Sequence, residues 1–249
     1  MKTLLRDLDA PTKSLSALKE LIPEGSNIHS FFLFAGALEI PLAFYNRHLT
    51  AYTFSKEIHN FWTCALSDPA RIADLANNLF PPENEEAFYM LQEQLAEVKV
   101  PFLNAALFFL LNRCSVRGTV SYGNMNLRNF TPAALLRLEN FKISNFSVIH
   151  QVAPFLETFY SCDSDDYLLL PLGNFMTPLS YSKMIEKTAI PHLKLIDFLL
   201  GESKKWITVY DFHPQLLELY EGKQIIMVDQ FGRETPHSEK CKEVIIANF

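Results

Sequence analysis

Residues 31–42 constrain the fold of this chain more than any other stretch. The apolar run Phe31–Phe34 predicts a buried strand, and Gly36 predicts a tight turn before a helix that extends to about Asn46. A strand, a glycine turn and a helix in this order are typical of the first unit of an open α/β sheet, which binds its ligands at that turn. Glycine lets the backbone approach a ligand closely, but Leu38 occupies the second position of the usual glycine pair.

Strand and helix patterns alternate at both ends of the chain, whereas the middle is mostly helical. Further strands are predicted at 49–54, 146–150, 167–170, 205–210, 223–228 and 243–248, the last two as an antiparallel pair. Helices are predicted at 14–21, 56–66, 70–79, 84–98, 101–112, 132–140, 152–159, 182–200 and 214–220. We therefore expect an α/β domain formed by residues 1–65 and 151–249, with an inserted lobe at 66–150 that contains an exposed ribbon at 117–127.

Charge is distributed unevenly along the 249 residues. The net charge of −6 argues against a protein that coats nucleic acid with its whole surface. Residues 99–150 carry six basic side chains and one acid, a net charge of +5 that leaves −11 for the rest of the chain. A basic patch on an acidic body indicates an anionic partner, and a solvated face without a partner is an equally open interpretation.

Several classes of protein are disfavoured by the cysteines and by the apolar runs. The cysteines are Cys64, Cys114, Cys162 and Cys241. They lie far apart and form no CxxC pair, which argues against a zinc site. The most apolar run, 103–111, is too short to span a bilayer. The acidic stretch at 163–166 is more typical of a solvated turn than of a cation site. We expect a reduced, soluble, intracellular protein, cytoplasmic or assembled into a particle, that binds neither metal nor membrane.

Short motifs along the chain occur in an order found in one known family. They are Pro11-Thr12-Lys13-Ser14, Phe34-Ala35-Gly36, Ile58-His59-Asn60-Phe61-Trp62, Ser67-Asp68-Pro69, the apolar run that ends in Asn112-Arg113, Gly118 with Gly123-Asn124-Met125-Asn126, and the segments 216–220 and 243–248. In sum they resemble the Dam-type adenine-specific DNA methyltransferases, which methylate the exocyclic amine of adenine with S-adenosylmethionine. The resemblance covers nearly the whole chain. It implies an α/β fold: a Rossmann-like methyltransferase sheet with helices on both faces and an inserted, mainly helical, target-recognition-like lobe.

The catalytic motif of that family is lost. Where the family has Asp-Pro-Pro-Tyr, this chain has Leu170, Pro171, Leu172 and Gly173. In the family, the aspartate accepts a hydrogen bond from the adenine amine and the aromatic ring stacks on the flipped base. Leucine and glycine can do neither, so the resemblance implies no catalytic residue here.

The positions that correspond to the family's cofactor site have also changed. Lys13, Phe34 and Gly36 are retained, but Leu38 replaces the second glycine and Thr53 replaces the aspartate that binds two ribose hydroxyls. Losing catalytic and cofactor contacts together lowers a rate by several powers of ten. We therefore expect no bound cofactor and a catalytically inactive relative that acts as a binding or structural subunit of a larger assembly.

Two other interpretations remain open. The first is an active S-adenosylmethionine-dependent adenine-specific DNA methyltransferase with a rearranged site, in which Asn174 and Phe175 replace the lost motif. The second is an unrelated α/β enzyme that uses His213, Asp211 or Cys162. No nucleophile-elbow or triad pattern in the sequence supports the second.

Both DNA and protein are predicted partners. Arg113, Arg117 and Arg128 flank the predicted ribbon, and the resemblance implies that this lobe faces DNA, so we expect weak, salt-sensitive DNA binding. A fold retained without catalysis also predicts a complex, either a homo-oligomer or one with other chains. Phe102, Leu103, Phe108 and Phe109 offer apolar anchors for such a partner, although forming the core of the lobe is the simpler role for each of them.

Overall fold

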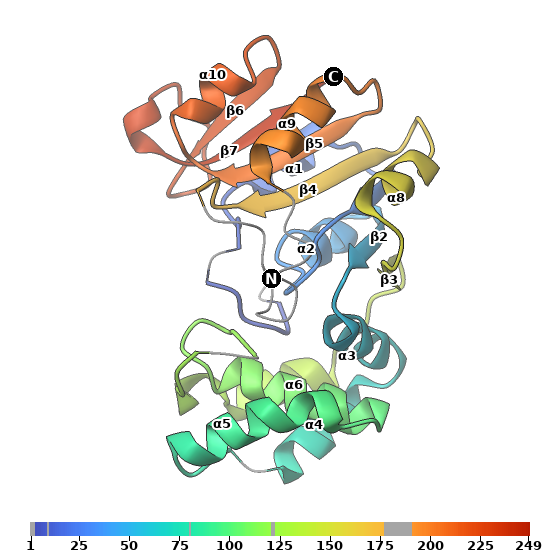
Figure 1. Ribbon diagram of the computed structural model, residues 1–249, viewed down its shortest axis with the longest axis vertical. Helices are drawn as coiled ribbons and strands as arrows, with labels where there is room; N and C mark the ends of the chain where they lie inside the picture. The colour runs from blue at the N-terminus through green and yellow to red at the C-terminus, as the bar shows by residue number, and fades with distance from the viewer. Residues whose placement is uncertain (1–2, 9, 80, 121–122, 177–190) are drawn as a thin grey trace.

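The computed structural model describes residues 3–8, 10–79, 81–120, 123–176 and 191–249. Its sheet and its helical lobe lie at opposite ends of the molecule (Figure 1). The first part of the helical pattern predicted at 182–200 lies outside the described residues, as do positions 121–122 of the predicted ribbon. No helix in the described ranges combines the length and the apolar character needed to cross a membrane.

A seven-stranded mixed sheet organises the larger part of the chain. Its strands are β1 (Asn27–Ser30), β2 (His48–Thr53), β3 (Phe146–His150), β4 (Tyr167–Gly173), β5 (Trp206–Asp211), β6 (Gln224–Asp229) and β7 (Cys241–Ala247). Their order is β3-β2-β1-β4-β5-β7-β6, with β1 to β5 parallel and β7 antiparallel to both of its neighbours. The order reverses between β1 and β4, which makes the carboxyl ends of these two strands the switch point where α/β sheets open a crevice.

Helices cover both faces of the sheet because its central strands are buried on both sides. Leu169 in β4 points into a core shared with α1 (Leu15–Leu21), α2 (Glu39–Phe44) and α3 (Lys56–Ser67). Its neighbours Leu168 and Leu170 point into a second core, against α8 (Phe155–Ser161), α9 (His192–Leu200) and α10 (Gln215–Leu219). Alternate residues of a strand face opposite sides, so an uninterrupted apolar strand needs a helical layer on each face.

The lobe consists mainly of helices inserted between β2 and β3. They are α4 (Pro69–Asn78), α5 (Glu85–Gln94), α6 (Pro101–Arg113) and α7 (Pro132–Glu139), with single 3₁₀ turns at Leu95–Glu97 and Leu127–Asn129. Helix α6 is buried along almost its whole length, because α3 and α4 pack against it. Since β3 belongs to the sheet, the helical part of the predicted 66–150 segment ends before residue 146.

The strand predicted at Phe31–Phe34 is wrong. β1 ends at Ser30, and residues 31–38 form the loop that leads to α2. Phe32 has a φ of 64°, in the left-handed region that interrupts an extended chain. The loop is nevertheless tied to the sheet, since the Phe31 N–H donates to the Leu169 carbonyl at 2.9 Å and the Leu33 N–H to the Tyr52 carbonyl at 2.8 Å. The apolar run therefore marks a buried loop.

The other six predicted strands are confirmed within about three residues at each end, including the antiparallel pair of β6 and β7. The predicted ribbon is reduced, among the described residues, to one antiparallel bridge between Ser115 and Met125, supported by a hydrogen bond from the Val116 N–H to the Asn124 carbonyl at 3.0 Å. The sequence expectation of an α/β sheet with helices on both faces is thus confirmed at the level of architecture.

Candidate functional site

Residues 170–173, which the resemblance aligns with a catalytic motif, form the carboxyl end of β4. Leu170 and Leu172 are buried, at 0% and 3% exposure, and both belong to the core beneath α8 and α9. Pro171 and Gly173 pair with Val209 and Tyr210 of β5 across a shift in register. The chain therefore continues as a strand here, and its side chains serve the core.

Aromatic rings fill the α8 side of the switch point. Phe31 stacks on Tyr52 with ring centroids 5.0 Å apart and meets Phe155 of α8 edge-on at 5.1 Å. Phe32 stacks on the same Phe155 ring at 5.6 Å. These rings are all buried and share their core with Leu170. The carboxyl ends of β1 and β4 on this side of the sheet are therefore packed with apolar side chains.

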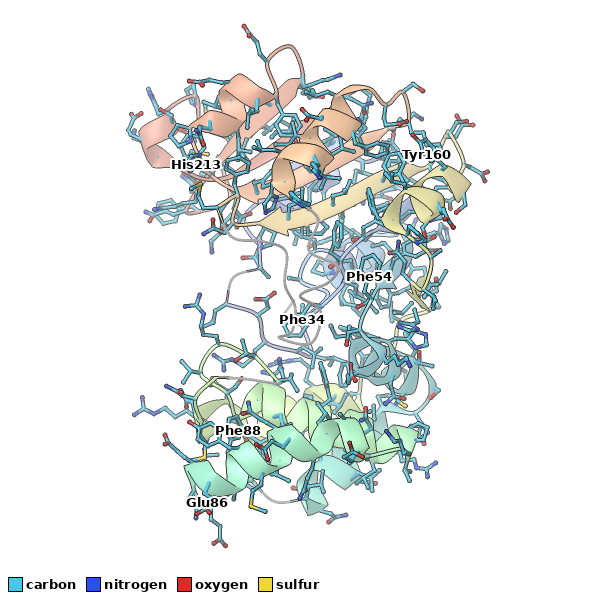
Figure 2. The ribbon with its side chains drawn as sticks, in the orientation of Figure 1. Phe34, Phe54, Glu86, Phe88, Tyr160 and His213 are labelled. Atoms are coloured by element: carbon cyan, nitrogen blue, oxygen red, sulfur yellow. The ribbon has the colours of Figure 1, made fainter. Side chains whose placement is uncertain are left out.

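The loop after β1 is closed by contacts with α3. Gly36 has a φ of 67°, and a Cβ at this position would lie 2.8 Å from Ile40 Cγ1 and 3.1 Å from Trp62 Cζ2. The Trp62 indole N–H donates to the Phe34 carbonyl at 2.8 Å, and Leu38 is buried at 1% exposure. Figure 2 shows Phe34 between the sheet and the lobe. The glycine makes room for a tryptophan of the same chain.

Polar groups at the end of β2 serve the backbone. Thr53 is buried, and its hydroxyl oxygen accepts the N–H of Ser55 at 3.3 Å. The Ser55 hydroxyl in turn caps α3 by accepting the Ile58 N–H at 3.2 Å, and donates to Glu57 at 2.8 Å. This position, which the resemblance aligns with a ribose-binding carboxylate, instead helps to start a helix.

The N-terminal loop at 12–14 surrounds a carboxylate of the chain itself. Glu243 of β7 is buried at 5% exposure. Its two oxygens accept the backbone N–H groups of Thr12, Lys13 and Ser14 at 2.9, 3.0 and 2.8 Å, and the Ser14 hydroxyl at 2.8 Å. Successive N–H groups that converge in this way form an anion-binding nest, and here Glu243 occupies it.

Glu39, at the start of α2, is a buried acid that sequence reasoning missed. It is 3% exposed, and its carboxylate accepts the Ser30 hydroxyl at 2.8 Å and the Leu38 N–H at 3.3 Å. Burial raises the pKa of this carboxyl, and the hydrogen bonds oppose that rise. An acid that directly follows an apolar run was the available sequence signal.

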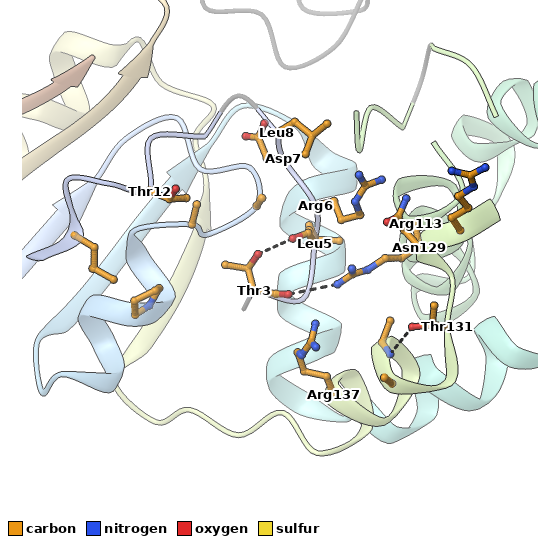
Figure 3. A pocket seen from close by; sticks show the side chains of 17 residues that line it. Thr3, Leu5, Arg6, Asp7, Leu8, Thr12, Arg113, Asn129, Thr131 and Arg137 are labelled. Carbon is orange, nitrogen blue, oxygen red and sulfur yellow. Dashed lines mark hydrogen bonds between the residues drawn. The ribbon is translucent and has the colours of Figure 1, made fainter. Parts of the chain in front are cut away.

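A cavity of about 810 Å³ lies where the N-terminal segment 3–8 meets the lobe (Figure 3). The loop after β1 contributes Ala35 and Ala37, and the first turn of α7 contributes Ala133 and Ala134. The remaining wall includes four arginines: Arg6, Arg113, Arg128 and Arg137. None of the aligned cofactor positions Lys13, Phe34, Gly36, Leu38 and Thr53 lines it.

The three arginines predicted to bind DNA lie in different environments. Arg113 is buried, and its guanidinium donates to the carbonyls of Thr3 and Leu4, so it anchors the N-terminal segment. Arg128 is exposed and lines the cavity. Arg117 is also exposed but lies outside the cavity wall. The structure thus brings Arg113 and Arg128 to one cavity, together with Arg6 and Arg137, which were not predicted as site residues.

A hydrogen-bonded chain of polar side chains crosses β1 and β2. His29 contacts the Tyr52 hydroxyl through Nδ1 at 2.8 Å and Asp166 through Nε2 at 3.0 Å. Asn27 donates to the other oxygen of Asp166 at 3.0 Å. Among the described residues, no group of three His, Cys, Asp or Glu side chains is arranged to hold a metal ion. The acidic stretch at 163–166 therefore contributes its last carboxylate to an internal network.

Two of the residues proposed for an unrelated enzyme, Cys162 and His213, have packing contacts, and the third, Asp211, pairs with Glu243 of β7 in the sheet. Cys162 donates to the Thr158 carbonyl of α8 at 3.3 Å, and burial raises the pKa of its thiol, which is the opposite of what a nucleophile needs. The His213 ring packs on Phe175 with centroids 5.4 Å apart, beyond the end of β5, whose last residue is Asp211.

No protein-family model matches this chain, and no curated protein matches it.

Proposed function

We propose that this chain is a catalytically inactive relative of the Dam-type DNA adenine methyltransferases that acts as a binding or structural subunit of a larger assembly. One observation carries the proposal: the switch point between β1 and β4, where such a sheet offers its reaction site, is packed with buried Phe31, Phe32, Tyr52 and Leu170. A flipped base needs an open pocket with a hydrogen-bond acceptor and a stacking ring. The phenylalanine and leucine side chains fill this space and carry no hydrogen-bond acceptor, and the Tyr52 hydroxyl is already bonded to His29 Nδ1 at 2.8 Å.

The cofactor positions support the same proposal. A ligand approaching the loop after β1 would meet Gly36 already packed against Trp62, and Leu38 turned into the core. The N–H groups of the 12–14 loop are bound to Glu243. Displacing these internal groups would leave buried donors and acceptors without partners, at about 1 to 3 kcal/mol each. We therefore infer that S-adenosylmethionine is not bound at physiological concentrations.

The geometry does not favour the alternative of a rearranged methyltransferase site at Asn174 and Phe175. The Asn174 side-chain oxygen accepts the Met176 N–H at 2.8 Å, which forms a local turn. The Phe175 ring packs against His192 at 5.7 Å and Tyr210 at 6.2 Å. In this arrangement the amide and the ring support the segment after β4.

Calorimetry with S-adenosylmethionine and transfer of a labelled methyl group to duplex DNA together test the proposal. We expect no heat of binding and no labelled DNA from the purified chain. The variant Leu170→Asp restores the carboxylate alone, and we expect it to remain inactive because the cofactor positions are unchanged. Saturable cofactor binding with methylated adenine in the product would overturn the proposal.

The assembly part of the proposal needs its own measurement. Light scattering of the purified chain and affinity capture from its native source should recover a homo-oligomer or a defined set of partner chains. A strictly monomeric chain that captures nothing would refute the subunit role, whatever the cofactor measurements show.

A further inference from the structure

The arginine-lined cavity is separate from the packed aromatic side of the switch point, although the loop after β1 forms part of its wall. Its volume of about 810 Å³ falls within the range of about 300 to 1,000 Å³ that small-molecule sites occupy. Leu5, Leu8, Leu15 and Pro41 give it apolar walls, and four arginines give it a strong positive charge. An apolar chamber with a few convergent charged groups is the usual composition of a ligand site.

Arginines outnumber acids on the described wall of this cavity. Asp7 is the single acidic residue on the described wall, against Arg6, Arg113, Arg128 and Arg137. Guanidinium groups that outnumber the nearby acids repel one another, and an anion in the cavity would relieve that repulsion.

Arg113 is the most buried of these arginines. Its side chain is 7% exposed, its Nε lacks any hydrogen-bond partner in the described chain, and its terminal nitrogen is used by the N-terminal segment. Burial, with Arg137 and then Arg6 nearby, lowers the pKa of Arg113 to about 10. A buried guanidinium with an unmet donor and two positive neighbours is a second, independent observation that favours an anionic ligand here.

We propose that this cavity binds a phosphorylated small molecule of about nucleotide size, with its phosphate paired to the arginines and its uncharged part against the apolar wall. Arginine is suited to this role because its planar guanidinium offers paired donors that match phosphate oxygens. The first turn of α7 forms part of the wall, and the positive end of its dipole favours an anion there. The same phosphate chemistry is available from a free nucleotide and from a nucleotide at the end of a nucleic-acid strand.

Calorimetry with pyrophosphate, ADP and adenosine at low salt tests the site. We expect pyrophosphate and ADP to bind and adenosine, which lacks phosphate, to bind at least about tenfold more weakly. The double variant Arg128→Gln/Arg137→Gln removes two arginines whose side chains make no hydrogen bond within the described chain. It should weaken ADP binding by about a hundredfold, since each charge-assisted pair contributes about tenfold or more.

The matched control is the double variant Arg71→Gln/Arg117→Gln, which removes the same charge from the lobe at exposed positions outside the cavity wall. We expect it to bind ADP like the wild type. Equal loss in both double variants, or no binding of pyrophosphate and ADP to the wild type, would overturn the proposal. If the first double variant does not fold, ADP binding can be measured instead with the single variant Arg128→Gln, which changes an exposed position.

A competing 5′-phosphorylated oligonucleotide distinguishes the two sources of phosphate. Displacement of ADP by the oligonucleotide would identify the end of a strand as the ligand, whereas ADP binding that the oligonucleotide does not affect would identify a free nucleotide. Both results uphold the site. Because S-adenosylmethionine has no phosphate, its binding measurement decides the proposed function separately from this one.

Discussion

The side-chain oxygen of Asn112, at the end of α6, accepts the backbone N–H of Arg6 at 2.8 Å, across 106 positions of the chain. The amide nitrogen of Asn112 returns a hydrogen bond to the Arg6 carbonyl at 2.9 Å and donates a second to the Gly118 carbonyl at 2.6 Å. One fully buried amide thus joins the N-terminal segment, α6 and the start of the bridged segment. The wall of the arginine cavity depends on this junction, because it fixes the backbone of Arg6.

The variant Asn112→Ala should lower the free energy of unfolding by about 3 kcal/mol, since three hydrogen bonds are lost and their backbone partners stay buried. Urea unfolding of the two proteins measures the difference. Asn140→Ala is the matched control, because Asn140 is exposed and makes a single side-chain bond, to the Leu136 carbonyl at 2.8 Å. We expect the control to lose less than about 0.5 kcal/mol. Equal losses in both variants would contradict the role assigned to Asn112.

Glu39 should make stability depend on pH. Its pKa is raised in the folded chain, so the native state holds this proton more tightly than the unfolded state does. The resulting stabilisation is complete below the unfolded pKa and is lost as pH rises through the folded pKa. Glu39→Gln cannot lose a proton, so the advantage of the variant over wild type should grow between pH 4 and pH 8 in urea unfolding.

Ser30→Ala should change the pH dependence of stability in the direction opposite to Glu39→Gln. The Ser30 hydroxyl lowers the pKa of Glu39 by a hydrogen bond, so its removal should raise that pKa further and steepen the loss of stability with pH. A pH dependence that is identical in wild type, Glu39→Gln and Ser30→Ala would show that Glu39 does not titrate as its burial requires.

Gly36→Ala should destabilise the loop after β1 for two reasons. The left-handed backbone disfavours a Cβ by about 1 to 2 kcal/mol, and the new atom would crowd Ile40 and Trp62. Gly25→Ala isolates the first effect, because Gly25 has a φ of 77° and open space around it. In urea titrations we expect Gly36→Ala to lose about 1 to 3 kcal/mol more than Gly25→Ala. Equal losses of unfolding free energy in the two variants would contradict tight packing of Gly36 against Ile40 and Trp62.

Glu243→Ala should empty the nest formed by Thr12, Lys13 and Ser14. The loss of several charge-assisted hydrogen bonds should lower the free energy of unfolding by about 3 kcal/mol. Formate or sulfate should then restore part of that loss in the variant, and should do so more than in wild type, where the carboxylate is already present. Chloride at the same ionic strength is the control. Equal responses of the two proteins to formate would argue against an anion-binding nest.

The limits of the sequence prediction can be seen at Phe31–Phe34. Alternating helix and strand patterns located six strands and the antiparallel end of the sheet, because those elements carry their own periodicity. The run of phenylalanines has the composition of a buried strand, and periodicity cannot separate this from a buried loop. The deciding facts were the left-handed backbone of Phe32 and the contacts with Leu169 and Tyr52, which belong to distant strands.

Two of the four arginines that line the cavity were predicted as site residues from the sequence. The predicted ribbon in the basic segment pointed to Arg113, Arg117 and Arg128, and of these Arg113 and Arg128 line the cavity. Arg6 joins them through the Asn112 junction, which no local pattern signals. Arg113 was predicted to face DNA, whereas most of its side chain is buried under the N-terminal segment. The charge pattern therefore located the region of the cavity, and tertiary contacts determined which residues form its wall.

The bond between Glu243 and the 12–14 loop has a consequence for biosynthesis. Ser14 and Glu243 are separated by 229 positions, which a ribosome translates in roughly 10 to 50 seconds at about 5 to 20 residues per second. During that interval the N–H groups of the 12–14 loop lack the carboxylate that binds them in the folded chain, and β5, once it has been synthesised, has no antiparallel neighbour until β7 follows. The 12–14 loop therefore remains accessible to chaperones and proteases until β7 emerges, so a segment translated long before β7 is among the last to be secured.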